Sequence, residues 1–324
     1  MFRGVVTAHE RPISVPAPAD ETLVARYRAN YGLSDDVDLT AEQIRGHLEL
    51  ERALTAALLA STPETRTATF ERCYDELYRR LPWLTSTGAP RSPSQWTAAL
   101  GRPPQRVYEV GSGAGALALA LADLGYDVEA TDISSERGHE RAASPGLTWT
   151  TTDGVNIEAF ARRGPYDAVI SDQVVEHLHP DDVVRHFAGC REILRPGGRL
   201  LFRTPHAFTG PHDISRVFGL DRPVGMHLRE YTNRELVGHL RAAGFRSIAA
   251  VMPLPPLAAR GGPAAVTSRA YLRSLLALER ILGTVEPARR RRAVDRLPGP
   301  LLPRIFLIAR ASRRSTSDAS RPER

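Results

Sequence analysis

The stretch Val107-Tyr-Glu-Val-Gly-Ser-Gly-Ala-Gly115 decides the fold of this chain. It reads as an apolar strand with one acidic residue, followed by a loop with glycine at every second position. The segment Ala116-Leu-Ala-Leu-Ala-Leu-Ala-Asp-Leu124 comes next and consists mostly of strong helix formers. A strand, a glycine turn and a helix in this order allow backbone N–H groups to approach a bound cofactor. The stretch therefore predicts an α/β fold with a ligand site at the turn.

Strand and helix patterns alternate after this turn, which is typical of a mostly parallel, Rossmann-like sheet with helices on both faces. We expect seven strands, at residues 106–110, 127–131, 147–151, 167–171, 199–203, 246–252 and 304–310. Helices are expected at 181–194 and 232–243, and Gly244 closes the second of them. The segment Arg195-Pro-Gly-Gly198 is expected to form the turn into the fifth strand.

The segments outside this core have patterns of their own. A capping-box pattern at Thr40-Ala-Glu-Gln43 predicts a helix start before the core. We predict a helical N-terminal region and linker at 1–104, the core at 105–253, a helical insertion at 254–303, the last strand at 304–311 and a disordered tail at 312–324. The insertion is expected to hold a helix from Val266 to about Leu282. We expect the N-terminal helices and the insertion to form two walls of the substrate opening.

The net charge of +6 does not extend over the whole chain. All 43 basic residues are arginines, and residues 285–324 contain eleven of them against four acidic residues. The rest of the chain therefore carries a net charge of −1, which disfavours a nucleic-acid-binding surface. The Arg-rich segment could contact an anionic membrane surface, and the alternative is a solvated arginine face.

The number of cysteines and the length of the apolar segments indicate the cellular compartment of the protein. The two cysteines, Cys73 and Cys190, form neither a disulfide framework nor a Cys-x-x-Cys metal site. The first ten residues lack the apolar core of a signal peptide, and apolar runs stay below the ~18 residues of a membrane span. We therefore expect a cytoplasmic protein.

Four motifs together resemble class I S-adenosylmethionine (SAM)-dependent methyltransferases. The loop Glu109-x-Gly-x-Gly-x-Gly115 is similar to the first motif of that family, whereas the third glycine of a dinucleotide-binding Gly-x-Gly-x-x-Gly loop would fall at Ala116. The other three are Tyr166-Asp-Ala-Val-Ile-Ser-Asp-Gln-Val-Val-Glu-His-Leu178, Leu194-Arg-Pro-Gly-Gly-Arg-Leu-Leu-Phe-Arg-Thr-Pro205, and His227-Leu-Arg-Glu-Tyr-Thr-Asn-Arg-Glu-Leu236 with Ala243-Gly-Phe245.

The resemblance is to the branch that includes ubiquinone-pathway O-methyltransferases, and it covers roughly residues 105–252 and the last strand. It implies the strand order 3-2-1-4-5-7-6, with SAM over the first two strands and the acceptor over strands four and five. In such a sheet, cofactors lie at the carboxyl ends of the strands.

Polar groups at these strand ends are the predicted SAM ligands. Glu109 could accept from the SAM ammonium, Asp132 could bind both ribose hydroxyls, and Asp153 could accept from the adenine amine. The predicted cofactor-binding residues are Glu109, Gly111, Ser112, Gly113, Gly115, Asp132, Ile133, Asp153, Gly154, Asp172 and Gln173.

A pair of residues after the fourth strand, Glu176-His177, resembles part of a metal site. Plant small-RNA 2′-O-methyltransferases and ubiquinone-pathway O-methyltransferases bind a divalent metal through Glu-x-x-Glu-His and a later His. Gln173-Val-Val-Glu176-His177 and His227 match those places, which implies Mg²⁺ or Mn²⁺ on Glu176, His177 and His227. Gln173 departs from the motif and is a weaker, neutral ligand. The alternatives are a His or Asp base without a metal, or a Glu-His pair that only opens a helix.

Further candidate bases follow the fifth strand. His206, His212 and Asp213 should line the substrate side, where a His near its free pKa can take a proton from a hydroxyl. The alternative for each His is a purely structural role in its loop. The predicted catalytic residues are Glu176, His177, His206, His212 and His227.

These residues predict a SAM-dependent O-methyltransferase. The acceptor would be a hydroxyl of a small or glycosidic molecule, such as a sugar, an oligosaccharide or a natural product. The N-terminal segment is similar to actinobacterial sugar-tailoring methyltransferases, including those acting on mycofactocin oligosaccharide. The alternatives are an N- or C-methyltransferase of a small metabolite, an RNA 2′-O-methyltransferase, a nicotinamide-dependent oxidoreductase and a non-catalytic SAM-binding module. The sequence identifies neither the acceptor nor the oligomeric state.

Overall fold

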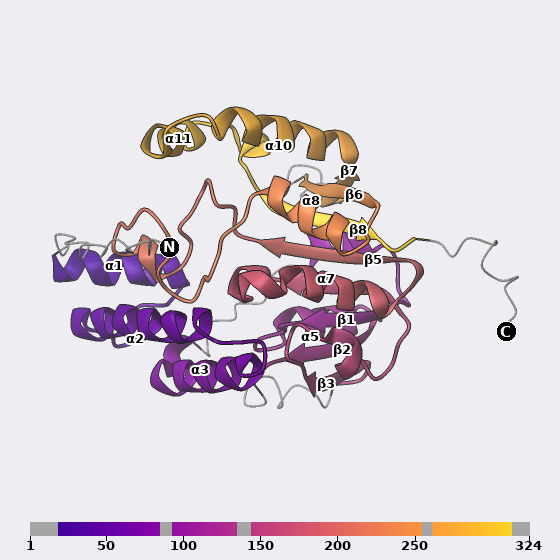
Figure 1. Cartoon of the computed structure of the whole chain (residues 1–324), viewed down its shortest axis with the longest axis horizontal. Coiled ribbons are helices and arrows are strands. Elements are labelled where there is room, and N and C mark those ends of the chain that lie inside the picture. Colours follow the sequence, from indigo (N-terminus) through magenta and orange to yellow (C-terminus); the bar gives the residue numbers. More distant parts are fainter. Residues whose placement is uncertain (1–18, 85–92, 135–143, 255–260, 313–324) are drawn as a thin grey trace, which may run out of the picture.

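The computed structural model describes residues 19–84, 93–134, 144–254 and 261–312. An eight-stranded sheet runs through its centre in the order β3-β2-β1-β4-β5-β8-β6-β7 (Figure 1). The strands are β1 (Arg106–Val110), β2 (Asp127–Asp132), β3 (Leu147–Thr151), β4 (Tyr166–Asp172), β5 (Leu194–Thr204), β6 (Ser247–Pro253), β7 (Ala265–Ser268) and β8 (Ile305–Arg310). Strands β1 to β5 pair in parallel, and β8 is antiparallel to both β5 and β6. The predicted Rossmann-like, mostly parallel sheet is confirmed, with β7 as an additional strand.

Two details of the predicted elements were wrong. Val266, expected to start a helix, lies in β7 and pairs with Met252, because two consecutive β-branched residues favour an extended edge strand. Residues 195–198, expected to form a turn, are part of β5, and the pairing of β4 with β5 changes register beside them. Residues 313–324 of the predicted tail and 85–92 of the predicted linker lie outside the described residues.

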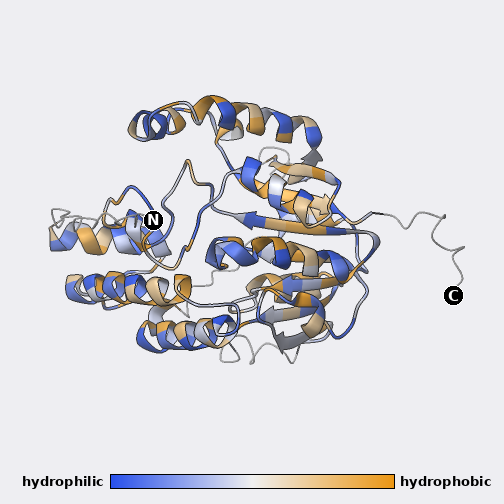
Figure 2. Cartoon of the chain, viewed as in Figure 1, coloured by the Kyte–Doolittle hydropathy of each residue, from blue (hydrophilic) through white to orange (hydrophobic). Residues whose placement is uncertain are grey.

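Helices surround this sheet. They are α1 (Asp20–Tyr31), α2 (Ala41–Leu59), α3 (Arg66–Arg80), α4 (Ser94–Leu100), α5 (Ala116–Asp123), α6 (Ile157–Phe160), α7 (Val183–Glu192), α8 (Asn233–Ala242), α10 (Arg269–Leu282) and α11 (Pro287–Val294). Short 3₁₀ segments are η1 (Pro82–Leu84), η3 (Val175–His177), η4 (Pro180–Asp182), η5 (Ile214–Arg216) and η6 (Gly299–Leu301). The predicted capping box at Thr40 and Gln43 starts α2, and a second capping box starts α8. Apolar and polar bands alternate along α2 and α10 in Figure 2.

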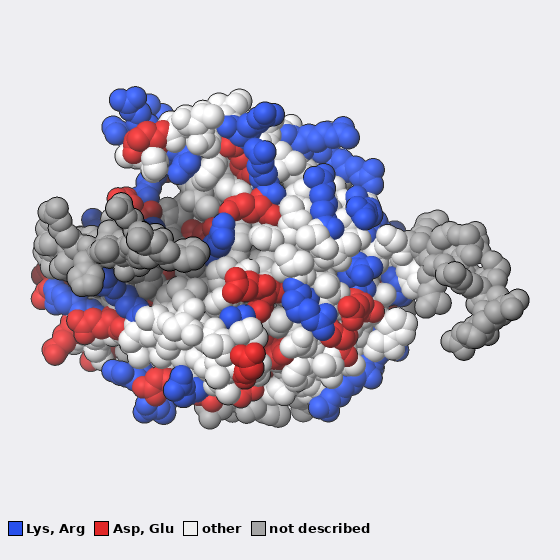
Figure 3. Space-filling view, viewed as in Figure 1, with Lys and Arg blue, Asp and Glu red and all other residues white. Residues whose placement is uncertain are grey.

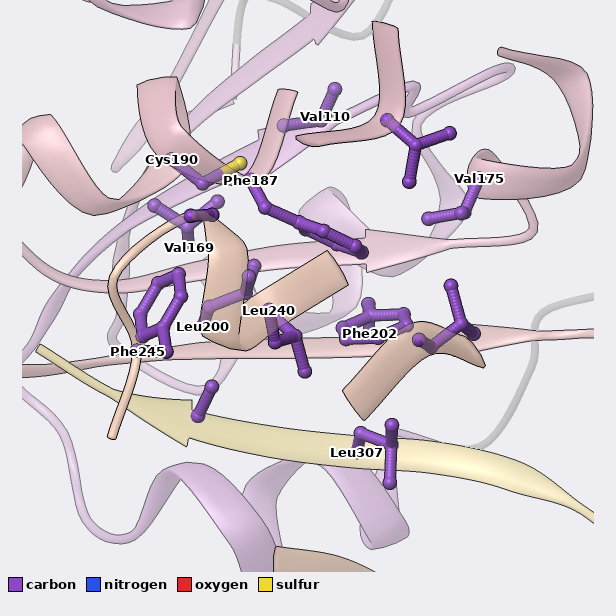
Figure 4. Close-up of a cluster of buried hydrophobic side chains, with 14 of the residues drawn as sticks. Val110, Val169, Val175, Phe187, Cys190, Leu200, Phe202, Leu240, Phe245 and Leu307 are labelled. Carbon is purple, nitrogen blue, oxygen red and sulfur yellow. The ribbon is translucent and has the colours of Figure 1, made fainter. Parts of the chain in front are cut away.

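The hydrophobic core has one layer on each face of the sheet. Helices α7, α8 and α10 cover one face, whereas α4 and α5 cover the other. Successive residues of β5 alternate between the layers: Leu200 and Phe202 face the first, and Leu201 faces the second. Figure 4 shows the first layer, where Phe202 lies close to Phe187 of α7. This two-sided burial fixes the strand ends in place.

The N-terminal helices pack at the edge of the sheet towards which β5 points (Figure 1). Helices α2 and α3 form an apolar cluster with Met226, and α1 and α2 form another with Ile214 and Val217. These three residues belong to the connection between β5 and α8. The N-terminal helices therefore cover the loop that carries several of the predicted catalytic residues.

Phe202→Ala should destabilise the protein by about 3–5 kcal/mol, because the ring is fully buried and its loss leaves a cavity. Urea unfolding followed by circular dichroism measures this loss. Leu124→Ala is the matched control, since Leu124 is 49% exposed and its truncation should change stability by less than about 0.5 kcal/mol. Equal effects of the two substitutions would contradict the packing of this layer.

Candidate active site

A cavity of about 460 Å³ lies where the carboxyl ends of β1, β2 and β4 face the N-terminal helices. Phe70, Tyr74, Leu77 and Tyr78 of α3 form part of the wall opposite the sheet. Ten of the predicted cofactor-binding residues line this cavity: Glu109, Gly111, Ser112, Gly113, Asp132, Ile133, Asp153, Gly154, Asp172 and Gln173. The remaining one, Gly115, lies behind them at the start of α5.

The glycine loop owes its shape to backbone conformations that favour glycine. Gly111 has a φ of 67°, and a Cβ on it would lie 2.4 Å from Cγ2 of Val174. Gly115 has a φ of 72° and is the N-cap of α5, so its role is to turn the chain into the helix. The N–H of Gly113 donates to Oδ2 of Asp132 at 2.8 Å. This bond ties the loop to the end of β2.

Glu109 presents a buried carboxylate to this cavity. Its side chain is almost fully buried, and Oε2 has no hydrogen-bond partner among the described residues. Burial raises the pKa of Glu109 to about 8, and the nearby carboxylates of Asp172 and Asp132 add to the rise against a hydrogen bond from Ser112. A cation in the cavity would satisfy this oxygen and restore the ionised form. The residue therefore suits an ammonium group.

The other two predicted carboxylates are held by the backbone that follows them. Asp132 accepts from Gly113 N and from Ser134 N at 3.3 Å. Asp153 accepts from the N–H groups of Val155 and Asn156 at 2.8 and 2.7 Å, so it also shapes the turn after β3. Both side chains reach the cavity as fixed hydrogen-bond acceptors.

Glu176, His177 and His227 come together beyond the end of β4. One oxygen or nitrogen atom from each lies within 4.8 Å of the others. Nδ1 of His177 lies 2.9 Å from the carbonyl oxygen of Met226, and Nδ1 of His227 lies 2.9 Å from Oε1 of Glu230. Both partners accept, so each Nδ1 carries a proton, and each ring in its neutral form keeps a lone pair on Nε2. The two rings meet edge to face, with centroids 4.9 Å apart.

The pKa values of the three side chains in this cluster are shifted in different directions. Glu176 is fully buried; burial raises its pKa to about 7, although His227 opposes the rise. Its Oε2 accepts from Thr204 Oγ1 at 2.7 Å, whereas Oε1 has no hydrogen-bond partner among the described residues. Burial and His227 lower the pKa of His177 to about 3, so this ring is neutral. Burial alone would lower the pKa of His227, but Glu230, Glu176 and Asp213 together raise it.

Sequence reasoning missed Glu230, which links two of the predicted histidines. Its Oε1 accepts from Nδ1 of His227 and from the backbone N–H of His212 at 2.7 Å. Its Oε2 lies 3.2 Å from Nδ1 of His212. Burial alone would raise the pKa of Glu230, yet these two histidines lower it to about 2. The available signal was its position three residues after His227.

Sequence reasoning also missed Glu51 of α2, because a charged residue in a helix normally faces solvent. This side chain is buried, with Oε1 2.7 Å from Nε2 of His47 and Oε2 accepting from Met226 N at 3.0 Å. The carbonyl of Met226 accepts from His177. The backbone of Met226, hydrogen-bonded to Glu51 on one side and to His177 on the other, therefore connects the N-terminal helices to the cluster.

The remaining predicted bases have other surroundings. Nδ1 of His206 accepts from Phe208 N, and Nε2 lies 2.7 Å from Oε1 of Glu279, so both nitrogens are engaged away from the cluster. His212 lies beside the cluster through Glu230. Asp213 accepts from the N–H groups of Ser215 and Gly225 and caps η5.

A second cavity, of about 510 Å³, lies on the other side of the cluster. Its walls come from the end of β5, the start of β8 and the end of α11. Four residues line both cavities: Gln173, His177, His212 and His227. Gln173 has a φ of 61°, a conformation uncommon for a residue with a side chain and frequent at functional sites. The cluster therefore stands between two spaces.

A known family shares this arrangement of fold and motifs. The family described as a methyltransferase domain matches residues 76–250, more than half of the chain. The chain belongs to the class I SAM-dependent methyltransferases. The methyl donor is SAM.

Curated relatives of this methyltransferase include two ubiquinone biosynthesis O-methyltransferases. The one from Xanthomonas axonopodis pv. citri (strain 306) is 32% identical over 157 residues, which cover 44% of this chain and 62% of the relative. The one from Cereibacter sphaeroides is 30% identical over 138 residues, which cover 40% of this chain and 54% of the relative. The chain thus spans less than two thirds of the length of these relatives.

A solved structure supports the fold assignment of this methyltransferase. It is described as "Conversion of a Disulfide Bond into a Thioacetal Group during Echinomycin Biosynthesis" and aligns with a TM-score of 0.50 at 17% identity. The alignment covers 77% of this chain and 95% of that chain.

No helix within the described ranges is both long and apolar enough to cross a membrane. The expected contact of the Arg-rich C-terminal segment with a membrane surface stays a prediction.

Asp132→Ala should weaken binding of S-adenosylhomocysteine about tenfold or more, because hydrogen bonds to a charged group contribute roughly 1.5–3 kcal/mol. Isothermal titration calorimetry measures this affinity. Asp123→Ala is the matched control, since Asp123 is exposed at the end of α5 and should leave binding unchanged. Unchanged affinity in Asp132→Ala, or tight binding of NADH in place of the nucleoside, would contradict the assignment of the first cavity.

Proposed function

We propose that this chain transfers the methyl group of SAM to a hydroxyl oxygen of a small or glycosidic acceptor that carries a second oxygen beside it. The observation that carries this proposal is the cluster of Glu176, His177 and His227 between the two cavities. The distant O-methyltransferase relatives support oxygen as the acceptor atom.

The two cavities give the two substrates separate places. The first contains the glycine loop and the carboxylates at the ends of β1 and β2, which suit SAM. The described residues that line the second cavity include none of these groups, and it lies on the other side of His177 and His227, which suits the acceptor. A methyl group would pass across the wall that both cavities share. Binding both reactants against this wall reduces the entropic cost of bringing them into line.

Within the cluster, Glu176 is the best candidate to take the proton of the acceptor hydroxyl. A pKa of about 7 makes the carboxyl group an effective acid–base catalyst near neutral pH. Its Oε1 is free of other hydrogen bonds, while Thr204 holds Oε2 in place. His177, with its low pKa, is a poor base, and its neutral ring offers Nε2 to the substrates as a hydrogen-bond acceptor. SAM supplies a sulfonium-activated methyl group.

The same three side chains also fit a divalent metal. Oε1 of Glu176 and Nε2 of both histidines are the atoms of this cluster without a hydrogen bond to any described residue. The carbonyl of Met226 and the carboxylate of Glu230 hold the opposite ring nitrogens, as partners of metal-ligating histidines commonly do. A bound Mg²⁺ or Mn²⁺ would bind both acceptor oxygens and lower the pKa of the hydroxyl.

His227→Ala should lower turnover about 10²-fold or more, because it removes one member of the cluster. It should also weaken Mn²⁺ binding at least tenfold in titration calorimetry, a measurement that needs no acceptor. Turnover is followed as S-adenosylhomocysteine formation with a panel of catechols and sugars. His239→Ala is the control, because His239 packs on Tyr231 and lines neither of the two cavities.

Treatment with EDTA distinguishes a metal-assisted reaction from a reaction that uses Glu176 as a base without a metal. Loss of turnover in EDTA with recovery in Mn²⁺ would support the metal. Turnover that survives EDTA but is lost in Glu176→Gln would assign the chemistry to the base alone. Full activity of Glu176→Gln and His227→Ala on the best acceptor would contradict the proposed centre.

In the metal-free enzyme, kcat/KM should rise with pH through about 7 and then level off. The rise follows from the raised pKa of Glu176, since only the ionised carboxylate accepts the proton. Initial rates between pH 5.5 and 8.5 measure this profile. Glu176→Gln should give a low rate without the rise, and a profile that is flat in the unmodified protein would contradict the assignment of the base.

A further inference from the structure

The second cavity contains charged side chains that the proposed chemistry does not use. Its arginines are Arg203, Arg216 and Arg304, and its acidic residues are Glu176 and Asp295. Asp172 neutralises Arg203 through two hydrogen bonds, at 2.8 and 2.5 Å. Arg216 and Arg304 are exposed, and neither guanidinium lies within 4.0 Å of a carboxylate oxygen of the described residues. Two cationic groups are therefore available to a ligand.

Neighbouring arginines are in a different situation. The guanidinium of Arg290 lies 4.2 Å from the centroid of the Phe208 ring, and Arg291 forms an ion pair with Asp221 at 3.2 Å. Figure 3 shows that arginine side chains gather over α10 and α11 on the face in view. The free guanidinium groups of Arg216 and Arg304 thus differ from basic residues of α11, which already have protein partners.

Both free arginines stand on backbone that the fold holds in place. Arg304 immediately precedes Ile305, which pairs with Thr204 in the ladder of β5 and β8. Thr204 donates a hydrogen bond to Glu176, a member of the cluster. Arg304 is one residue before the partner of Thr204, which corresponds to a step of about 3.3 Å along the strand. The carbonyl of Arg304 accepts from Asn233 Nδ2 at 2.9 Å.

Arg216 ends η5, which begins at the cap residue Asp213. Its N–H donates to the Asp213 carbonyl at 3.1 Å, and its own carbonyl accepts from Gly219 N at 3.1 Å. The residue just before this cap, His212, belongs to the wall between the cavities. Arg216 and Arg304 therefore approach the second cavity from two different elements, each anchored close to the cluster.

We propose that the second cavity binds an acceptor that carries a carboxylate or phosphate group, held by Arg216 and Arg304. The guanidinium group binds both anions through paired N–H donors and stays charged at every physiological pH. The acceptor hydroxyl then lies at the cluster while the anionic group lies at the mouth of the cavity. This assignment rests on the proposed function and narrows its substrate class to hydroxy acids, acidic sugars or phosphorylated sugars.

Matched compounds test the anionic group by binding, without need of turnover. Calorimetry on the full chain saturated with S-adenosylhomocysteine compares catechol with 3,4-dihydroxybenzoate, and glucose with glucuronate and glucose 6-phosphate. We expect at least one anionic compound to bind tenfold or more tightly than its neutral partner. The two sugar acids also separate a carboxylate preference from a phosphate preference.

The variant Arg216→Gln/Arg304→Gln should reduce this difference to less than about threefold and leave S-adenosylhomocysteine binding unchanged, since neither residue lines the first cavity. Arg291→Gln is the control, and it should keep the full preference because Arg291 already pairs with Asp221. Binding without discrimination in the unmodified chain, undetectable binding of every compound, or a preference that survives in the double variant would overturn the proposal. Anion-dependent binding without methyl product would support this proposal while contradicting the proposed function.

Discussion

The parallel pairing of β1 with both of its neighbours is the constraint on which the site depends. Val110, the last residue of β1, lies beside Thr131 of β2 and Ser171 of β4. The residues that follow each strand therefore emerge at one edge, within reach of one another. Asp132, Asp172 and the glycine loop are separated in sequence, and only this common register brings them around one cavity. A slip by one residue would turn these side chains to the other face of the sheet.

Burial of carboxylates at the carboxyl ends of the strands determines which of them can act on a ligand. Carboxylates that are buried cost free energy unless hydrogen bonds or charges compensate. Glu230 and Glu51 are compensated by histidines and backbone N–H groups, so they act as fixed supports. Glu109 and Glu176 each keep one oxygen without a partner among the described residues. A buried acceptor without a hydrogen-bond partner calls for one, such as a water molecule, an ion or a ligand. The two oxygens belong to different cavities, which is consistent with a donor site and an acceptor site on opposite sides of one wall.

The N-terminal helices contribute side chains to the site. Helix α3 lines the first cavity through Phe70 and Tyr74, and Glu51 of α2 lines it too and accepts from the backbone N–H of Met226. The carbonyl of Met226 fixes the tautomer of His177. A segment outside the sheet thereby helps to orient a residue of the cluster beyond the end of β4. The insertion contributes to the second cavity instead, through Val294 and Asp295 at the end of α11.

The positions of most strands followed from the sequence alone, because strand periodicity and glycine turns are local properties of the chain. The order of these strands in the sheet came from the resemblance to class I methyltransferases. The sequence also determined which strand ends carry polar groups, and the motif at 173–177 with His227 singled out a cluster that the folded chain brings together. The local sequence pattern predicted the wrong secondary structure at positions where pairing with a neighbouring strand determines the backbone conformation. Val266 joined the sheet because β6 offered an edge to pair with, and residues 195–198 form the irregular part of β5 where its pairing with β4 changes register.

Only the tertiary structure decided which histidines keep a free nitrogen. His206 and His227 look alike in sequence, yet Glu279 and Phe208 occupy both nitrogens of the first, whereas Glu230 holds one nitrogen of the second. The roles of Glu51, Glu230 and the two free arginines likewise depend on partners far away in the chain. The physical reason is that charge and hydrogen bonding at a buried site are set by three-dimensional neighbours, which no local pattern of residues specifies.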